Sequence, residues 1–187
     1  MHTVARLRDS ERGYNLVEVL IAMALMGTVL MSIMGLFYFG RRNVYSGKEM
    51  TEAVAVATHV REDLSAMTKA AALAAFGLGA ATTGTTNTVA GQTFSNSFVR
   101  TTTSISATTD PTGNYLTKWQ NEMVNDSKFQ NGVVTLVLIP DKDPLHGTAQ
   151  LKDASVVRIR VFVTWGEAVR TRQVVLDVIK LDHSAGT

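Results

Sequence analysis

The stretch RGYNLVEVLIAMALMGTVLM, from Arg12 to Met31, decides how the chain begins. It places one carboxylate, Glu18, inside a segment that otherwise has the composition of a membrane helix. From Val19 to Gly40 there is no charged residue, and this run of about 22 residues exceeds the ~20 that a helix needs to cross a bilayer. A charge at the centre of a bilayer costs about 2.5–3.5 kcal/mol or more unless it is paired, so Glu18 is a candidate functional residue.

A secretory signal peptide is the main alternative for this segment. Its apolar region would be roughly 7–15 residues long and would end in a small-x-small cleavage site. The run here is longer and ends in Phe37-Tyr38-Phe39-Gly40-Arg41-Arg42. We therefore expect a retained membrane anchor.

The flanking charges do not set the orientation of this anchor. Three basic residues precede it and three follow it, namely Arg6, Arg8 and Arg12 against Arg41, Arg42 and Lys48. The positive-inside count is therefore a tie. A short cytoplasmic N-terminal arm with an exported C-terminal body is the simpler topology.

Length and composition limit the possible function classes. The 187 residues suffice for one globular domain with its own core. A net charge of +2, from 18 Lys and Arg against 16 Asp and Glu, creates no basic field that would indicate nucleic acid binding. The chain has no cysteine, which excludes a disulfide framework, a thiolate metal site and a cysteine nucleophile.

The residues around Glu18 carry a resemblance to a known family. Gly13, the aromatic Tyr14 and then Leu16-Val17-Glu18-Val19-Leu20-Ile21-Ala22 closely resemble the N-terminal methylation motif of type IV prepilins and pseudopilins. That family has a short basic leader ending in Gly, an aromatic first mature residue, a Glu four residues later and a long apolar helix. The resemblance implies cleavage between Gly13 and Tyr14 by a membrane aspartic peptidase, the prepilin peptidase, which would also methylate the new amine of Tyr14.

Three positions depart from the common family pattern. Tyr14 stands where Phe is usual, and Asn15 replaces the common Thr or Ser. Both substitutions keep an aromatic residue followed by a polar one, so we expect processing to survive. Gly35 lies where many major pilins carry a helix-kinking Pro, and this leaves local unwinding of the helix open.

The resemblance also implies a role for Glu18. Cleavage after Gly13 creates an ammonium group on Tyr14, which can neutralise the Glu18 carboxylate in the same chain or in a neighbouring chain during assembly. In this family the pairing is thought to align an incoming subunit with the growing filament. The alternative is that Glu18 lies at the membrane interface and extends toward the lipid headgroups.

The remaining pattern predicts helix followed by sheet. Apolar residues three or four apart after Arg42 indicate one face of an amphipathic helix: Met50, Ala53, Val54, Ala57, Val60, Leu64, Met67 and Ala71. Without a proline between Tyr14 and Phe76, we expect one continuous helix that ends near Gly77 or Gly79. The segment 79–112 is rich in Thr, Ala, Ser and Gly and indicates exposed loop, with short edge strands as the alternative.

Further along, residues 115–123 predict a short helix or an ordered loop anchored by Trp119. The apolar run Val133–Ile139, closed by Pro140, predicts a central strand. Alternating apolar residues in Ser155–Trp165 predict a half-buried strand, and a turn at Gly166-Glu167 followed by a return strand to Leu181 predicts a β-hairpin.

These elements give five expected segments: a cleaved basic leader (1–13), the transmembrane and assembly half of the N-terminal helix (14–40), its amphipathic soluble half (41–76), a Thr- and Gly-rich variable connection (77–131) and a C-terminal antiparallel β-sheet (132–187). The hairpin resembles the end of minor pilins of the pilus-modification type and of minor pseudopilins of type II secretion. The resemblances imply an α+β, pilin-like fold in which a long N-terminal helix, transmembrane in its first half, packs on a small antiparallel sheet.

The expected function is therefore that of a minor type IV pilin, a structural and assembly subunit that enters or primes a pilus filament. A minor pseudopilin of a type II secretion or DNA-uptake (competence) system is the alternative, and a single-pass membrane-anchored periplasmic enzyme or receptor is a third reading. The implied partners are other pilin or pseudopilin subunits through the N-terminal helix, the prepilin peptidase and the inner-membrane assembly platform. The implied location is the inner membrane, with a periplasmic C-terminal domain, and then the filament.

No residue pattern indicates catalysis, so we expect neither an enzyme nor a cofactor. The four histidines, His2, His59, His146 and His183, do not converge in the sequence. Asp141 and Asp143 suggest calcium, but Leu145 replaces the third oxygen ligand of an EF-hand and no terminal Glu follows, so turn chemistry explains them better. Asn125-Asp126-Ser127 fits a glycosylation triplet, a pattern too short to be specific.

Overall fold

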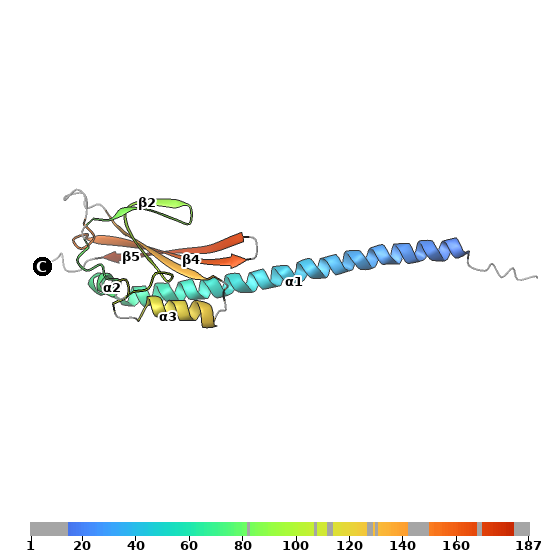
Figure 1. Cartoon of the computed structure of the whole chain (residues 1–187), viewed down its shortest axis with the longest axis horizontal. Coiled ribbons are helices and arrows are strands. Elements are labelled where there is room, and N and C mark those ends of the chain that lie inside the picture. The colour runs from blue at the N-terminus through green and yellow to red at the C-terminus, as the bar shows by residue number, and fades with distance from the viewer. Residues whose placement is uncertain are drawn as a thin grey trace, which may run out of the picture. The chain divides into compact units, whose positions relative to one another are not determined.

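The computed structural model describes residues 15–81, 83–106, 108–111, 114–126, 129, 131–141, 150–167 and 170–181 (Figure 1). It divides into two compact units, Met1–Gly47 and Lys48–Thr187. Helix α1 (Leu16–Ala66) begins in the first unit and ends in the second. Each unit is described by itself below.

The part of α1 in the first unit is helical although its described side chains are exposed or half-buried. No residue of α1 before Ala53 is buried. Asn15 caps its start: the amides of Glu18 and Val19 donate to the Asn15 carbonyl oxygen at 2.8 and 3.3 Å, and the Val17 amide donates to the Asn15 side-chain oxygen at 3.4 Å. The long apolar helix expected from the sequence is thus present.

The prediction of one continuous helix to Phe76 was wrong. Helix α1 ends at Ala66, and a separate helix, α2 (Lys69–Ala75), follows. Thr68 between them is extended, with φ −70° and ψ 163°, and its side chain accepts from the Ala71 amide at 3.2 Å. Lys180 donates to the Ser65 carbonyl at 3.1 Å and also to the Met67 carbonyl, so backbone groups at the break have partners.

The second unit contains a five-stranded antiparallel sheet in the order β1-β2-β3-β4-β5. The strands are β1 (Thr85–Val89), β2 (Gln92–Thr101), β3 (Val133–Pro140), β4 (Val156–Glu167) and β5 (Arg170–Leu181). The predicted central strand is confirmed, because β3 pairs with both β2 and β4. The predicted hairpin is confirmed too, since β4 and β5 pair in one register from Val156 opposite Leu181 to Glu167 opposite Arg170. The turn predicted at Gly166-Glu167 was wrong, because both residues belong to β4 and continue the ladder.

The Thr-rich segment contributes more to the sheet than its composition indicates. Strand β1 lies at one edge, but the ten-residue β2 pairs on both sides and places Phe98 opposite Leu138. The expectation of exposed loop across 79–112 was therefore wrong for most of 85–101. Polar residues can form these strands because the inter-strand hydrogen bonds satisfy the backbone N–H and C=O groups whether or not the side chains are buried.

The core of the second unit joins the C-terminal part of α1 to one face of the sheet (Figure 1). The predicted inward residues of β4 are all buried: Val157, Ile159, Val161, Val163 and Trp165. On α1 the buried residues are Ala53, Val56, Ala57, Val60 and Leu64, whereas Met50 and Val54, expected on this face, are each 42% exposed. Trp119 is fully buried in the short helix α3 (Leu116–Asn121), which a π-helical turn, η1 (Glu122–Asp126), extends.

The observed class is therefore α+β: a long, apolar N-terminal helix and a five-stranded antiparallel sheet.

Candidate functional site

The most unusual surface of the molecule is the apolar length of α1 in the first unit. Every large apolar side chain between Leu16 and Tyr45 is exposed, from 42% at Val19 to 78% at Met31. Within the described residues, one helix, α1, is long and apolar enough to cross a membrane, and none of its apolar window is buried. Exposed apolar area of this extent is unfavourable in water, so lipid or another protein must cover it.

The hydroxyl groups inside the apolar run are compatible with an apolar solvent. Thr28 donates its hydroxyl to the Leu25 carbonyl at 2.8 Å, and Ser32 donates to the Thr28 carbonyl at 2.9 Å. Each hydroxyl hydrogen is therefore satisfied by the same helix and would not be left unpaired in hydrocarbon.

Glu18 occupies the first turn of α1. The positive end of the helix dipole favours a carboxylate there, typically by about 0.3–1 kcal/mol at an exposed position. Glu18 borders a groove of about 280 Å³ that is otherwise lined by Val19, Ala22, Met23 and Met26. Among the described residues, no side chain pairs with its carboxylate.

Of the three site residues predicted from the sequence, the structure describes only Glu18. Gly13 and Tyr14, the predicted cleavage and methylation residues, lie outside the described part of the chain, as does the leader 1–13. The structure places Glu18 in the first turn of the exposed helix, and the pairing of its carboxylate with the Tyr14 amine stays a prediction.

A second polar cluster lies in the second unit, between α1 and α3. His59 Nδ1 lies 2.8 Å from Glu122 Oε2, and Asp63 accepts from Lys118 Nζ at 2.8 Å and from Trp119 Nε1 at 2.9 Å. The sequence reasoning missed this convergence, because 55 to 63 residues separate the partners and no motif links them.

The charge of Asp63 is set by this cluster. Burial raises the pKa of the Asp63 carboxyl, but hydrogen bonds from Lys118 and Trp119, with the charges of Lys118 and His59, outweigh it and hold that pKa below its ordinary value. No serine, threonine or cysteine nucleophile contacts the cluster in the described residues, and no three metal-ligating side chains gather there. What the arrangement does is hold α3 against α1.

The other residues singled out from the sequence are only partly described. Asp141 donates its amide to the Val156 carbonyl at 2.9 Å, whereas Asp143 lies outside the described residues. Of the glycosylation triplet, Asn125 and Asp126 lie in η1 and Ser127 is not described. His2, His146 and His183 are not described either.

Comparison with protein-family models, with curated proteins and with solved structures finds no match to this chain.

Proposed function

We propose that the chain is a minor type IV pilin, a processed assembly subunit that enters or primes a pilus filament. The observation that carries the proposal is Glu18 in the first turn of a helix whose large apolar side chains between Leu16 and Tyr45 are all exposed. In the sequence, Glu18 lies four residues after Tyr14 of the Gly13-Tyr14 pair. A lone carboxylate beside an otherwise uncharged apolar run is costly unless it has a partner. An amine created four residues earlier would supply one.

The exposed helix supports an assembly role because its apolar surface can be covered first by lipid and later by other subunits. Before assembly, lipid of the inner membrane would cover the apolar surface between Leu16 and Tyr45. In a filament, the helices of other subunits would replace that lipid. The prepilin peptidase and the inner-membrane assembly platform are the further partners that this route requires.

The first test is the mass of the N-terminal peptide of the protein recovered from membranes. We expect a peptide that begins at Tyr14 and carries one extra methyl group. Gly13→Val should leave the leader attached, whereas Gly27→Val, in the same helix, should be processed normally. A start at Met1 in the unaltered protein would contradict the proposal.

The second test separates anchoring from assembly. Glu18→Ala should be cleaved and inserted like the unaltered protein but should be strongly depleted from filaments, because the incoming subunit lacks its charged partner. Glu18→Gln removes the charge while nearly keeping the shape of the side chain, and it should be depleted from filaments as Glu18→Ala is. The matched control is Glu62→Ala, which removes an exposed carboxylate from the same helix outside the apolar run.

Filament recovery also separates this proposal from its nearest rival. A pilin should appear in filaments sheared from the cell surface. A pseudopilin of a secretion or DNA-uptake system should stay in the cell envelope with the same processed N-terminus.

A further inference from the structure

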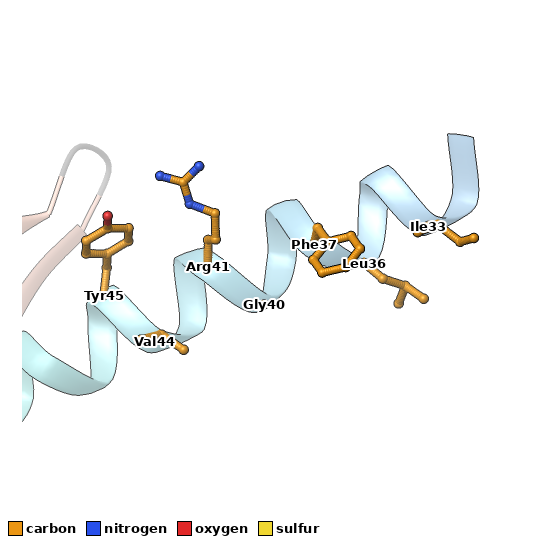
Figure 2. Close-up of a pocket in the computed structure, with 7 residues that line it drawn as sticks. All are labelled: Ile33, Leu36, Phe37, Gly40, Arg41, Val44 and Tyr45. Carbon is orange, nitrogen blue, oxygen red and sulfur yellow. The ribbon is translucent and has the colours of Figure 1, made fainter. Parts of the chain in front are cut away.

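A groove lies on α1 where the apolar run ends. Its volume is about 590 Å³, and its lining residues, all within the first unit, are Ile33, Leu36, Phe37, Gly40, Arg41, Val44 and Tyr45 (Figure 2). Gly40 leaves its floor open, since a Cβ built there would meet nothing within 4 Å. Apart from Arg41 and the Tyr45 hydroxyl, the wall is aliphatic and aromatic.

Arg41 places a positive charge at one end of this groove. Arg41 and Tyr45 project to the same side of the helix in Figure 2, and the Arg41 guanidinium carbon lies 6.0 Å from the centre of the Tyr45 ring. Arg42, one residue further, is also exposed but does not line the groove. In the described residues, no carboxylate pairs with either arginine.

The helical rise places these arginines at the boundary of a bilayer. From Glu18 to Arg41 the helix rises by about 35 Å, at 1.5 Å per residue, against a hydrocarbon core about 30 Å thick. When Glu18 lies at one boundary of the core, Arg41 and Arg42 therefore lie at the other. Tyr38 and Tyr45 flank them, and tyrosine is enriched at this depth.

We propose that this groove binds an anionic phospholipid, with the headgroup phosphate on Arg41 and an acyl chain along Leu36, Gly40 and Val44. The charge complementarity is direct, because a guanidinium is a preferred phosphate ligand and no carboxylate of the described residues pairs with Arg41. The inference rests on insertion of the apolar run into a membrane and not on filament assembly.

A second copy of the chain fits the groove less well than a lipid. Two parallel copies at the same depth would bring four arginines together at one level, and like charges repel. A helix packed over the groove would also bury Arg41 without a counter-charge, which is strongly unfavourable.

Native mass spectrometry of the full chain in detergent tests the lipid site. The protein is mixed with phosphatidylglycerol or with phosphatidylcholine of the same acyl chains, and the retained lipids are counted. We expect preferential retention of phosphatidylglycerol. R41Q should lower its affinity by roughly fivefold, which corresponds to about 1 kcal/mol per basic residue near an anionic lipid surface.

Gly40→Leu tests the groove independently of charge. The added side chain fills the floor, so retention of phosphatidylglycerol should fall although both arginines remain. The matched controls are R61Q, which removes an exposed arginine from the same helix, and Gly27→Leu, at another glycine whose Cβ would meet nothing within 4 Å. Both controls should bind lipid as the unaltered chain does.

Three results would overturn the lipid site. Equal retention of the two lipids would show that the site does not select an anionic headgroup. Unchanged retention of phosphatidylglycerol by Gly40→Leu would show that the lipid does not occupy the groove. A dimer peak that Gly40→Leu abolishes would assign the groove to a second copy of the chain. Because lipid is counted on unassembled protein, failure here leaves the filament proposal standing, and a normally assembling Glu18→Ala variant leaves the lipid site standing.

Discussion

Asp63 on α1 binds two neighbouring residues of α3. Its carboxylate accepts from an exposed ammonium, Lys118 Nζ, and from a buried indole, Trp119 Nε1. Because these bonds favour the charged form, the pKa of Asp63 lies below its ordinary value in the folded protein. The folded state is therefore stabilised above the ordinary pKa of an aspartate, and this contribution is lost as the pH falls through the lower, folded value.

Asp63→Asn should lower the free energy of unfolding by about 1–2 kcal/mol at neutral pH, since it removes the charge from two hydrogen bonds. The difference between the variant and the unaltered chain should begin to shrink below about pH 4, where the carboxyl becomes protonated in the unfolded state, and should be lost as the pH falls through the lower pKa of the folded state. Urea unfolding of the full chain in detergent, followed by tryptophan fluorescence, measures both effects. Glu62→Gln, an exposed neighbour, is the control, and an equal loss in that variant would contradict the assignment.

Gly77 is a second position where one residue type is required. Its φ is +64°, and a Cβ there would overlap the Thr108 carbonyl oxygen. Gly91 has a similar φ of +78° but open space around the Cβ position. Gly77→Ala should therefore destabilise the chain well beyond the roughly 1 kcal/mol expected from backbone strain alone in Gly91→Ala. Equal unfolding midpoints of the two variants would show that the close approach to Thr108 is relieved at no cost.

At the scale of elements, side chains distant in the sequence fix the ends of α2. Lys69 is 5% exposed and donates its ammonium hydrogens to the Lys152 and Ala154 carbonyls. Arg100 on β2 donates to the carbonyl of Phe76, the C-cap of α2, at 2.8 Å. Burial lowers the pKa of Arg100, but it remains far above neutrality for an arginine, so this bond is charged at all working pH values.

Thr68→Ala should destabilise the chain by about 1 kcal/mol, because it removes the side-chain oxygen that accepts from the Ala71 amide at the start of α2. Thr68→Ser keeps that oxygen and should be close to neutral. Thermal unfolding of the three proteins in the same detergent measures the difference. A serine variant as unstable as the alanine variant would mean that the methyl group, not the cap, stabilises the break.

At the scale of the whole molecule, the division into two units separates two kinds of stability. In the described part of the first unit, the structure is an apolar helix whose large apolar side chains are all exposed. The second unit holds the buried core, from Ala53 on α1 to Val178 on β5. The membrane is thus expected to stabilise the first unit, and side-chain packing the second.

A chain that begins at Lys48 should therefore remain folded and should leave the membrane fraction. The expected readout is a tryptophan emission matching that of the full chain, because Trp119 and Trp165 are both buried in the second unit. Cell fractionation and fluorescence measure the two outcomes. An aggregated or unfolded product would show that the helix before Lys48 is needed for the core.

The local features of the chain could be predicted from the sequence, because they depend on neighbours a few residues apart. The apolar run before Arg41, the alternation in β4 and the hairpin to β5 each follow from hydrophobic period and turn residues, and so does the carboxylate of Glu18 at the start of the run. The helix break at Thr68 and the Thr-rich β2 could not be predicted, because Lys180 and the strand β3 supply the backbone partners from far along the chain. Only the tertiary structure decided that four polar residues would meet, namely His59, Asp63, Lys118 and Glu122. The hydrophobic period of a helix shows which of its faces is apolar, but it does not show which polar residues of a distant element will contact that helix.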